Sequence, residues 1–125
     1  MNSNIRKLPD GELEVMQAVW AVPCPCNRSE IRSGLTASRE IAETTLLTML
    51  SRLADKGYLE IHKEGRSSVY SPLVSREEYL ASQGSRFFNK LCGGKISTLA
   101  SALCSSGLSR EELDELRRLL EKDEL

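Results

Sequence analysis

Residues 27–72 read NRSEIRSGLTASREIAETTLLTMLSRLADKGYLEIHKEGRSSVYSP, and this stretch decides the fold. It contains a short helical pattern, a polar turn, a longer helical pattern that stops at Gly57, and two β-prone runs. That order is typical of a winged helix-turn-helix, which places its second helix in a DNA major groove and a ribbon beside it. The stretch therefore predicts a DNA-binding regulator and not an enzyme.

The longer helical pattern has an apolar stripe on one side, formed by Leu46, Met49, Leu50 and Leu53. A helix that reads DNA needs close backbone approach, hydroxyls for phosphates or base edges, and a methyl-bearing side chain for thymine. We predict that the opposite face supplies these groups through Thr44, Thr45, Leu47, Thr48, Ser51 and Arg52. Leu47 is apolar on this polar face, so a thymine contact and a stray exposed leucine are both open interpretations.

A β-hairpin is predicted directly after Gly57, which fits the left-handed position that ends a helix. The runs YLEIHK and SSVYSP are β-prone and are separated by Glu64-Gly65-Arg66. Lys63 and Arg66 flank the turn, where a wing would touch phosphates. A solvated hairpin tip is the alternative, but its position directly after a reading helix favours the wing.

Two further helices are predicted ahead of the reading helix. The first covers about residues 10–21, with apolar residues at helical spacing, and we expect Trp20 of this helix in the core. The second begins at Asn27, which forms a capping box with Glu30. Together with the reading helix and the wing, these helices define a winged-helix DNA-binding domain over residues 1–74.

Residues 75–125 predict an all-helical region with capping boxes at Ser75 and Ser109 and glycine breaks between the helices. Three short amphipathic helices make too thin a core to stand alone. Pairing with a second copy would bury the surplus apolar stripes, whereas folding back on the first domain as a monomer is the alternative. The candidate dimer interface is formed by Leu99, Leu103, Leu113, Leu116 and Leu120. The expected fold class is thus mostly α with a small β-wing, followed by a helical dimerisation region.

Charge is balanced along the chain, which carries a net charge of −1. Residues 1–74 contain nine Lys or Arg and nine Asp or Glu. Because a strong nonspecific DNA binder would be basic, we expect salt-sensitive, site-specific binding through clustered positive charge. The candidates for one positive face are Arg28, Arg32, Arg52, Lys63 and Arg66.

The sequence contains no motif that would indicate an enzyme. His62 is the one histidine, and the chain lacks a nucleophile with a partner, a Gly-rich phosphate loop, an HExxH motif and paired carboxylates. There is also no apolar run long enough for membrane insertion and no apolar core of a signal peptide. We therefore expect a cytoplasmic protein without a cofactor.

The four cysteines leave one alternative open. Cys24 and Cys26 form a CxC motif in VPCPCN, and such a pair can bind Cu(I) or Zn(II) or react as a redox pair. Two thiolates alone rarely complete a tetrahedral site, so we predict no metal site and keep Cys24 and Cys26 as secondary candidates. Cys92 and Cys104 occupy apolar-looking positions and are expected to be buried.

Five segments of the chain resemble the penicillinase repressor family, BlaI/MecI/CopY. The similarity spans about residues 8–120 in the same order, through LPDGELEVMQAVW, TTLLTMLSRLADKGYL, KEGRSSVYSPLVSREEY, FFNKLCGG and LSREELDELRRLL. The resemblance implies a winged-helix repressor that binds DNA as a homodimer through its C-terminal helices.

The resemblance also implies a regulatory partner. In well-known members a membrane-bound sensor protease signals the inducer, and the repressor is cut at an Asn-Phe bond in the C-terminal domain. That bond would fall near Ala102-Leu103, and the cut sequence is absent here. The copper-responsive branch carries paired CxC motifs at the C-terminus, whereas this chain ends LEKDEL.

The leading hypothesis is a sequence-specific transcriptional repressor that acts as a homodimer on an inverted-repeat operator. The alternative from another class is a thiol-based metal or redox sensor that regulates transcription through Cys24 and Cys26. A winged helix used for protein contact is the third possibility.

Overall fold

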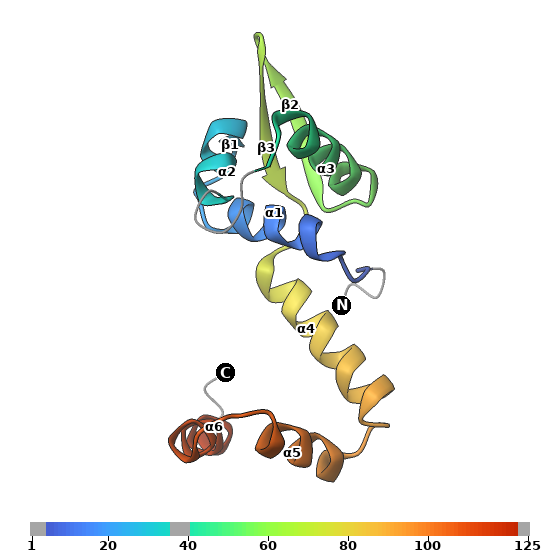
Figure 1. Ribbon diagram of the computed structural model, residues 1–125, viewed down its shortest axis with the longest axis vertical. Coiled ribbons are helices and arrows are strands. Elements are labelled where there is room, and N and C mark those ends of the chain that lie inside the picture. The colour runs from blue at the N-terminus through green and yellow to red at the C-terminus, as the bar shows by residue number, and fades with distance from the viewer. Residues whose placement is uncertain (1–4, 36–40, 123–125) are drawn as a thin grey trace. The chain divides into compact units, whose positions relative to one another are not determined.

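The computed structural model describes residues 5–35 and 41–122, and the chain divides into two compact units, Met1–Gln83 and Gly84–Leu125. Figure 1 shows the elements in chain order. The described elements of the first unit are α1 (Asp10–Trp20), β1 (Cys26–Asn27), α2 (Arg28–Leu35), α3 (Glu43–Asp55), β2 (Leu59–Glu64) and β3 (Ser67–Pro72). Helix α4 (Arg76–Arg86) runs across the division, and a π-helix (Phe87–Leu91), α5 (Ile96–Ser105) and α6 (Arg110–Lys122) follow. A mostly helical chain with a small antiparallel sheet confirms the expected fold class.

The core of the first unit is largely aliphatic, as the scarcity of aromatic residues requires. Each fully buried Leu, Ile, Val or Met contributes about 1.5–3 kcal/mol relative to an exposed one. The predicted stripe of α3 is confirmed, with Met49 partly buried at its edge. The innermost aliphatic side chains of the helices come from α1, α2 and α3. They include Val15, Met16, Val19, Ile31, Leu46, Leu50 and Leu53.

Helix α3 ends at the residue that the sequence predicted. Gly57 has φ of +84°, its N–H donates to Ala54 O, and the N–H of Tyr58 donates to Leu53 O. These two hydrogen bonds form a Schellman motif, for which a residue without Cβ is the usual choice. The motif turns the chain sharply from α3 into β2, so the ribbon begins next to the end of α3.

The predicted ribbon is a hairpin in which Glu64 pairs with Ser67 and Gly65 at the turn has φ of +62°. A third strand was not predicted: β1 pairs antiparallel with β3, and the sheet order is β1-β3-β2. Strand β1 has two residues and follows two prolines, which is too short for an alternating pattern to be seen. It positions the start of α2 beside the ribbon.

The beginning of α4 packs into the first unit through Tyr79. The Tyr79 hydroxyl accepts a hydrogen bond from the Leu8 N–H at 3.0 Å, and its ring lies 5.7 Å from Trp20 and 6.0 Å from Tyr58. The predicted capping box is present, with Ser75 and Glu78 exchanging hydrogen bonds at 2.8 and 3.0 Å. The compact unit therefore extends beyond Val74, and the functional division at residue 74 stays a prediction.

The second unit has little core of its own. The helix that begins after Ser75 changes to a π-helix at Phe87, where the Cys92 N–H donates to Phe87 O, before the glycine break at residues 93–94. Within the described residues, α5 and α6 bury no side chain fully. Cys92 is buried as expected, but the expectation for Cys104 is wrong: it is exposed, and none of the described residues covers this position of α5.

Among residues 5–35 and 41–122, none of the helices combines the length and the apolar composition that a bilayer-spanning segment needs.

Candidate nucleic-acid interface

The outward face of α3 carries the six side chains that the sequence proposed as readers. All six are exposed, and Leu47 among them is 38% exposed. The opposite side of the same helix is buried in the core, so the backbone of α3 is held while its polar face stays accessible. The residues of this face are Thr44, Thr45, Leu47, Thr48, Ser51 and Arg52.

Thr48 has a defined hydrogen-bonding role on this face. Its hydroxyl donates to the carbonyl oxygen of Thr44, one turn earlier, at 2.9 Å. Because the hydroxyl proton is used within the helix, the oxygen is left to accept hydrogen bonds. A base-edge amino group or the methyl group of thymine are the contacts that such a threonine can make.

The wing presents two cations near its turn. Figure 1 shows the β2–β3 ribbon as the extended hairpin beside α3. Lys63 lies opposite Ser68 in the register, Arg66 follows Gly65 in the turn, and both side chains are exposed. Neither cation forms an ion pair with another part of the described chain. Both are therefore available for phosphate.

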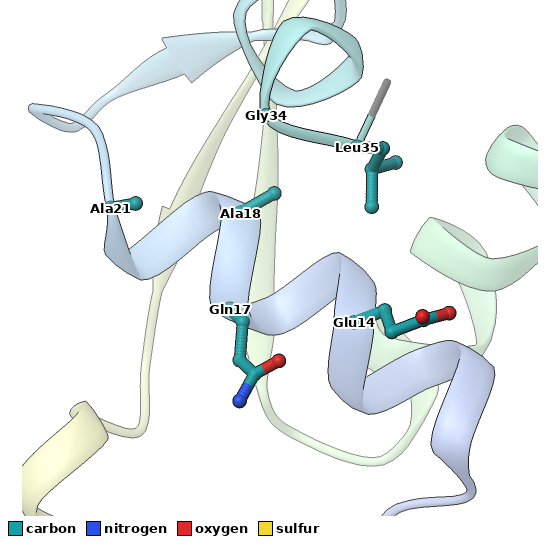
Figure 2. Close-up of a pocket in the computed structure, with 6 residues that line it drawn as sticks. All are labelled: Glu14, Gln17, Ala18, Ala21, Gly34 and Leu35. Carbon is teal, nitrogen blue, oxygen red and sulfur yellow. The ribbon is translucent and has the colours of Figure 1, made fainter. Parts of the chain in front are cut away.

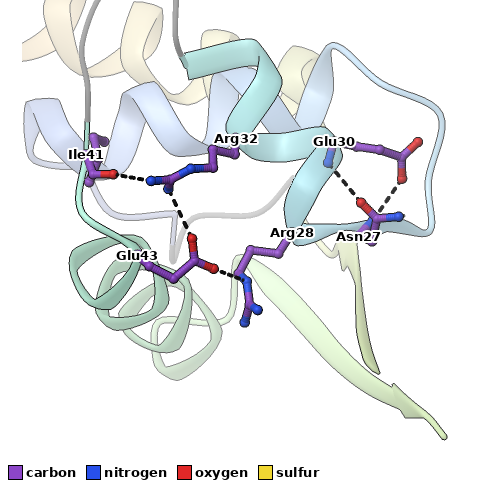
Figure 3. A network of polar contacts seen from close by, with 6 residues as sticks. All are labelled: Asn27, Arg28, Glu30, Arg32, Ile41 and Glu43. Carbon is purple, nitrogen blue, oxygen red and sulfur yellow. Dashed lines mark hydrogen bonds and ion pairs between the residues drawn. The ribbon is translucent and has the colours of Figure 1, made fainter. Parts of the chain in front are cut away.

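Helix α2 begins beside α3 with the predicted capping box. The Asn27 side chain accepts from the Glu30 N–H at 2.8 Å, and the Glu30 carboxylate accepts from the Asn27 N–H at 2.9 Å. Arg28, the first residue of α2 and a candidate for the positive face, lies with its Nε 2.5 Å from Glu43 Oε2 (Figure 3). Its side chain is still 44% exposed, so the guanidinium is paired within the protein and open to solvent.

Arg32, the second arginine of α2 and also a candidate for the positive face, contacts two groups within the protein. Its Nη2 donates to the Ile41 carbonyl oxygen at 2.8 Å, and its Nη1 lies 3.3 Å from Glu43 Oε1 (Figure 3). Nη1 makes no hydrogen bond of good geometry, so its contact with Glu43 is mainly electrostatic. Arg32 thus fixes the backbone just before α3.

Sequence reasoning missed Glu43 as a member of this surface. It occupies the first turn of α3, where a carboxylate is expected for the helix dipole alone. Its partners are on the preceding helix, and only the fold brings them together. The sole sequence signal was the i, i+4 spacing of Arg28 and Arg32, which puts both arginines on one face of α2.

The Cys24 and Cys26 Sγ atoms lie 3.7 Å apart. Cys24 is exposed, whereas Cys26 is buried in β1 with its thiol 3.6 Å from Tyr70 O. Burial raises the pKa of Cys26 to about 12, and the hydrogen bond and charge of Cys24 add to the shift. In the part of the chain that the structure describes, no three metal-ligating side chains lie together.

A shallow hollow of about 220 Å³ lies between α1 and α2 (Figure 2). Gly34 allows the close approach of the two helices, since a Cβ there would stand 3.2 Å from Ala18 Cβ. The lining offers one carboxylate and one amide and holds no nucleophile with a base. It is formed by Glu14, Gln17, Ala18, Ala21, Gly34 and Leu35.

Comparison with known proteins identifies the family of the chain. The family model described as Penicillinase repressor matches residues 8–122. The chain is 34% identical to the penicillinase repressor of Bacillus licheniformis over 94% of this chain and 92% of that protein. It is 26% identical to the methicillin resistance regulatory protein MecI of Mammaliicoccus sciuri, over 98% and 99% of the two chains.

Two solved structures resemble the fold. One is the solution structure of Bacillus licheniformis BlaI in its monomeric form with the blaP half-operator, with a TM-score of 0.50 and 39% identity over 60% of this chain and 90% of that chain. The other is the DNA-binding domain of the repressor BlaI, with a TM-score of 0.51 and 38% identity over 58% of this chain and 88% of that one. The chain belongs to the penicillinase repressor family and is a DNA-binding transcriptional repressor of the winged-helix class, not an enzyme.

Proposed function

We propose that this repressor acts as a homodimer on an inverted-repeat operator. The observation that supports DNA binding by α3 is its amphipathic character. One side of the helix is buried in the core, and the other side exposes short polar side chains and Arg52. One short helix and one ribbon make few contacts, so a tight site needs two copies. The BlaI relative in complex with a half-operator supports a site built of two halves.

The residues of the surface divide into two roles. Thr44, Thr45, Thr48 and Ser51 are short enough for α3 to approach base edges, and Arg52 can reach a guanine or a phosphate. Leu47 fits contact with a thymine methyl group. Arg28, Lys63 and Arg66 lie outside α3 and would bind phosphate, which sets position and salt dependence but little sequence preference.

In the proposed dimer, the two copies contact each other through apolar side chains of the C-terminal helices. The proposed interface residues are half-buried at four positions, and the last, Leu120, is 57% exposed. Full burial of an exposed leucine contributes about 1.5–3 kcal/mol, and each of these partly exposed leucines would contribute a fraction of that value in an interface. A two-fold dimer covers both copies of the same surface at once. The residues concerned are Leu99, Leu103, Leu113, Leu116 and Leu120.

A selection from random DNA tests this function and identifies the operator in the same experiment. The full-length protein is incubated with random duplexes, and the bound fraction is amplified and sequenced. We expect enrichment of an inverted repeat whose half-sites are about 10 bp apart, or a multiple of it. Enrichment of a single half-site, or of no sequence, would contradict the proposal.

Membership of the family suggests two further points, which concern cleavage by a sensor protease and the location of the protein in the cell. Ala102 and Leu103, where the cut bond of other members would fall, lie inside α5 and are half-buried. With the cut sequence absent, we expect the chain to resist cleavage at Ala102-Leu103 by a family sensor protease. Because a repressor acts where the DNA is, we expect the protein in the cytoplasm.

The distance between the two thiols favours a second role, which we propose as thiol sensing. With hydrogen peroxide as oxidant, the Cys24 thiol would become a sulfenic acid with loss of water. Although its raised pKa makes the thiolate scarce, Cys26 lies 3.7 Å away, and as a thiolate it would then attack the sulfenic acid, forming the disulfide and releasing a second water. Mass spectrometry should show a Cys24–Cys26 disulfide after mild peroxide treatment and weaker operator binding that a reductant restores. Unchanged DNA affinity of the oxidised protein would overturn this role.

A further inference from the structure

Glu43, at the start of α3, forms an ion pair with Arg28, a cation that DNA phosphate would also bind. It occupies the first turn of α3, and its carboxylate contacts two arginines of α2, with Arg28 at 2.5 Å and Arg32 at 3.3 Å (Figure 3). The carboxylate is 47% exposed and the Arg28 side chain 44%. The ion pair is therefore accessible to an approaching phosphate.

The two arginines differ in what else holds them. Arg32 also donates to the carbonyl oxygen of Ile41, so its guanidinium is fixed to the backbone ahead of α3. Among the described residues, Glu43 is the one ion-pair partner of Arg28. Arg28 can therefore leave while Arg32 continues to compensate the charge of Glu43.

The position of the pair puts it in direct competition with DNA. The first helix of a helix-turn-helix crosses the DNA backbone, and residues near helix N-termini meet phosphate oxygens. Arg28 is the first residue of α2. A phosphate that comes to Arg28 must either tolerate the Glu43 carboxylate beside it or take over the guanidinium.

We propose that Glu43 competes with DNA phosphate for the Arg28 guanidinium and thereby lowers the affinity of the protein for DNA in general. Because a phosphate contact carries little sequence information, this cost applies to an operator and to a random sequence alike. Glu43 therefore acts through Arg28 as a residue that sets the overall strength of DNA binding. This role rests on DNA binding by this surface and needs neither a dimer nor a known operator.

The test is a double-mutant cycle with a duplex that contains no inverted repeat. Glu43→Gln, Arg28→Met and the double variant are compared with wild type by fluorescence anisotropy at several salt concentrations. Glu43→Gln should bind about two- to fivefold tighter, the range of an exposed ion pair. Arg28→Met should bind more weakly, and its log–log salt slope should fall by about 0.9. The double variant should match Arg28→Met, because the gain requires the arginine.

A matched control separates this role from simple repulsion. Glu60 is an exposed glutamate of β2 without an ion-pair partner in the described chain. Glu60→Gln makes the same change of charge, and its effect should be equal with and without Arg28. If Glu43→Gln tightens binding equally in the Arg28→Met background, the competition is wrong. Weaker binding by Glu43→Gln would also overturn it.

Thermal unfolding shows whether each variant is folded. If Glu43→Gln does not fold, Glu43→Ser removes the carboxylate and leaves a residue that is favourable near a helix N-terminus. The same tighter binding and the same dependence on Arg28 are then expected. The measurement with a nonspecific duplex does not depend on dimer formation. A negative result would therefore contradict the role of Glu43 and leave the dimer proposal unaffected.

Discussion

The indole Nε1–H of Trp20 donates a hydrogen bond to the carbonyl oxygen of Val74 at 2.9 Å, although 54 residues separate them. The bond joins the end of α1 to the chain that leaves β3. It explains why Trp20, expected in the core, is only partly buried: its ring packs on the core and on Tyr79, and its polar atom faces the backbone.

Trp20→Phe should destabilise the first unit by at least about 1 kcal/mol, because one hydrogen bond is lost and the smaller ring fills only part of the space of the indole. Urea unfolding of the variant and of wild type measures the difference. DNA affinity of the folded variant should be unchanged, since Trp20 lies outside α3 and the wing. An unchanged midpoint would show that water replaces the bond at no cost.

Changes on the outward face of α3 should weaken DNA binding without unfolding the protein. Arg52→Ala and Thr48→Ala each remove an exposed group, so the core is untouched. A lost base-edge contact costs about 1–3 kcal/mol, and a lost phosphate contact lowers the salt slope by about one unit. Affinity for the selected operator at moderate salt measures both effects. If both variants bind like wild type, α3 is not the reader.

Removal of the wing cations should affect binding to all DNA sequences, unlike the changes on α3. Lys63→Ala and Arg66→Ala should weaken binding to operator and to random duplex by similar factors, because phosphate contacts carry little sequence information. The ratio of the two affinities is the measurement. A lower ratio at unchanged nonspecific affinity would mean that the wing reads bases.

The two thiols of the CxC motif should react at very different rates. Cys26 is buried and its pKa is raised to about 12, so it stays protonated at pH values where the exposed Cys24 is alkylated. Peptide mass spectrometry after brief iodoacetamide treatment at pH 8 should find the label on Cys24. Equal labelling of both thiols in the folded protein would contradict the burial of Cys26.

The same pKa shift predicts how stability depends on pH. The Cys26 thiol ionises near 9.0 in the unfolded chain and near 12 in the folded one, so alkaline pH between these values favours unfolding. The free energy of unfolding should fall above pH 9, and less so in Cys26→Ala. An identical decline in both proteins would assign it to other groups.

Periodicity and local motifs accounted for most of the fold. The stripe of α3, the left-handed Gly57 and the capping boxes at Asn27, Ser75 and Ser109 all depend on residues within one or two turns of each other. Such signals are complete in the sequence. The exposed face of α3 followed from the same periodicity, because the helix has to bury the stripe.

The missed features depend on tertiary contacts or on very short elements. Pairing of Arg28 with Glu43 joins two helices, and β1 has only two residues. The π-helix after Arg86 has no periodic signature of its own. Exposure of Cys104 could not be foreseen, since an apolar-looking position on a helix does not show whether a partner covers it.

The dimer proposal predicts that one charged substitution is enough to separate the copies. Leu116→Glu should place a carboxylate in the interface and yield a monomer with much weaker operator affinity, since each half-site must then bind alone. Truncation after Gln83, which keeps Tyr79, should have the same effect on affinity and leave the first unit folded. The stability of the first unit should be unaffected by Leu116→Glu.

The central claim is tested most directly by sedimentation of the full-length protein at micromolar concentration, alone and with a duplex that carries the selected inverted repeat. The account predicts a dimer in the absence of DNA and a complex of two chains per duplex. A monomer in solution that binds the intact operator as a single chain, with the affinity it has for one half-site, would contradict it.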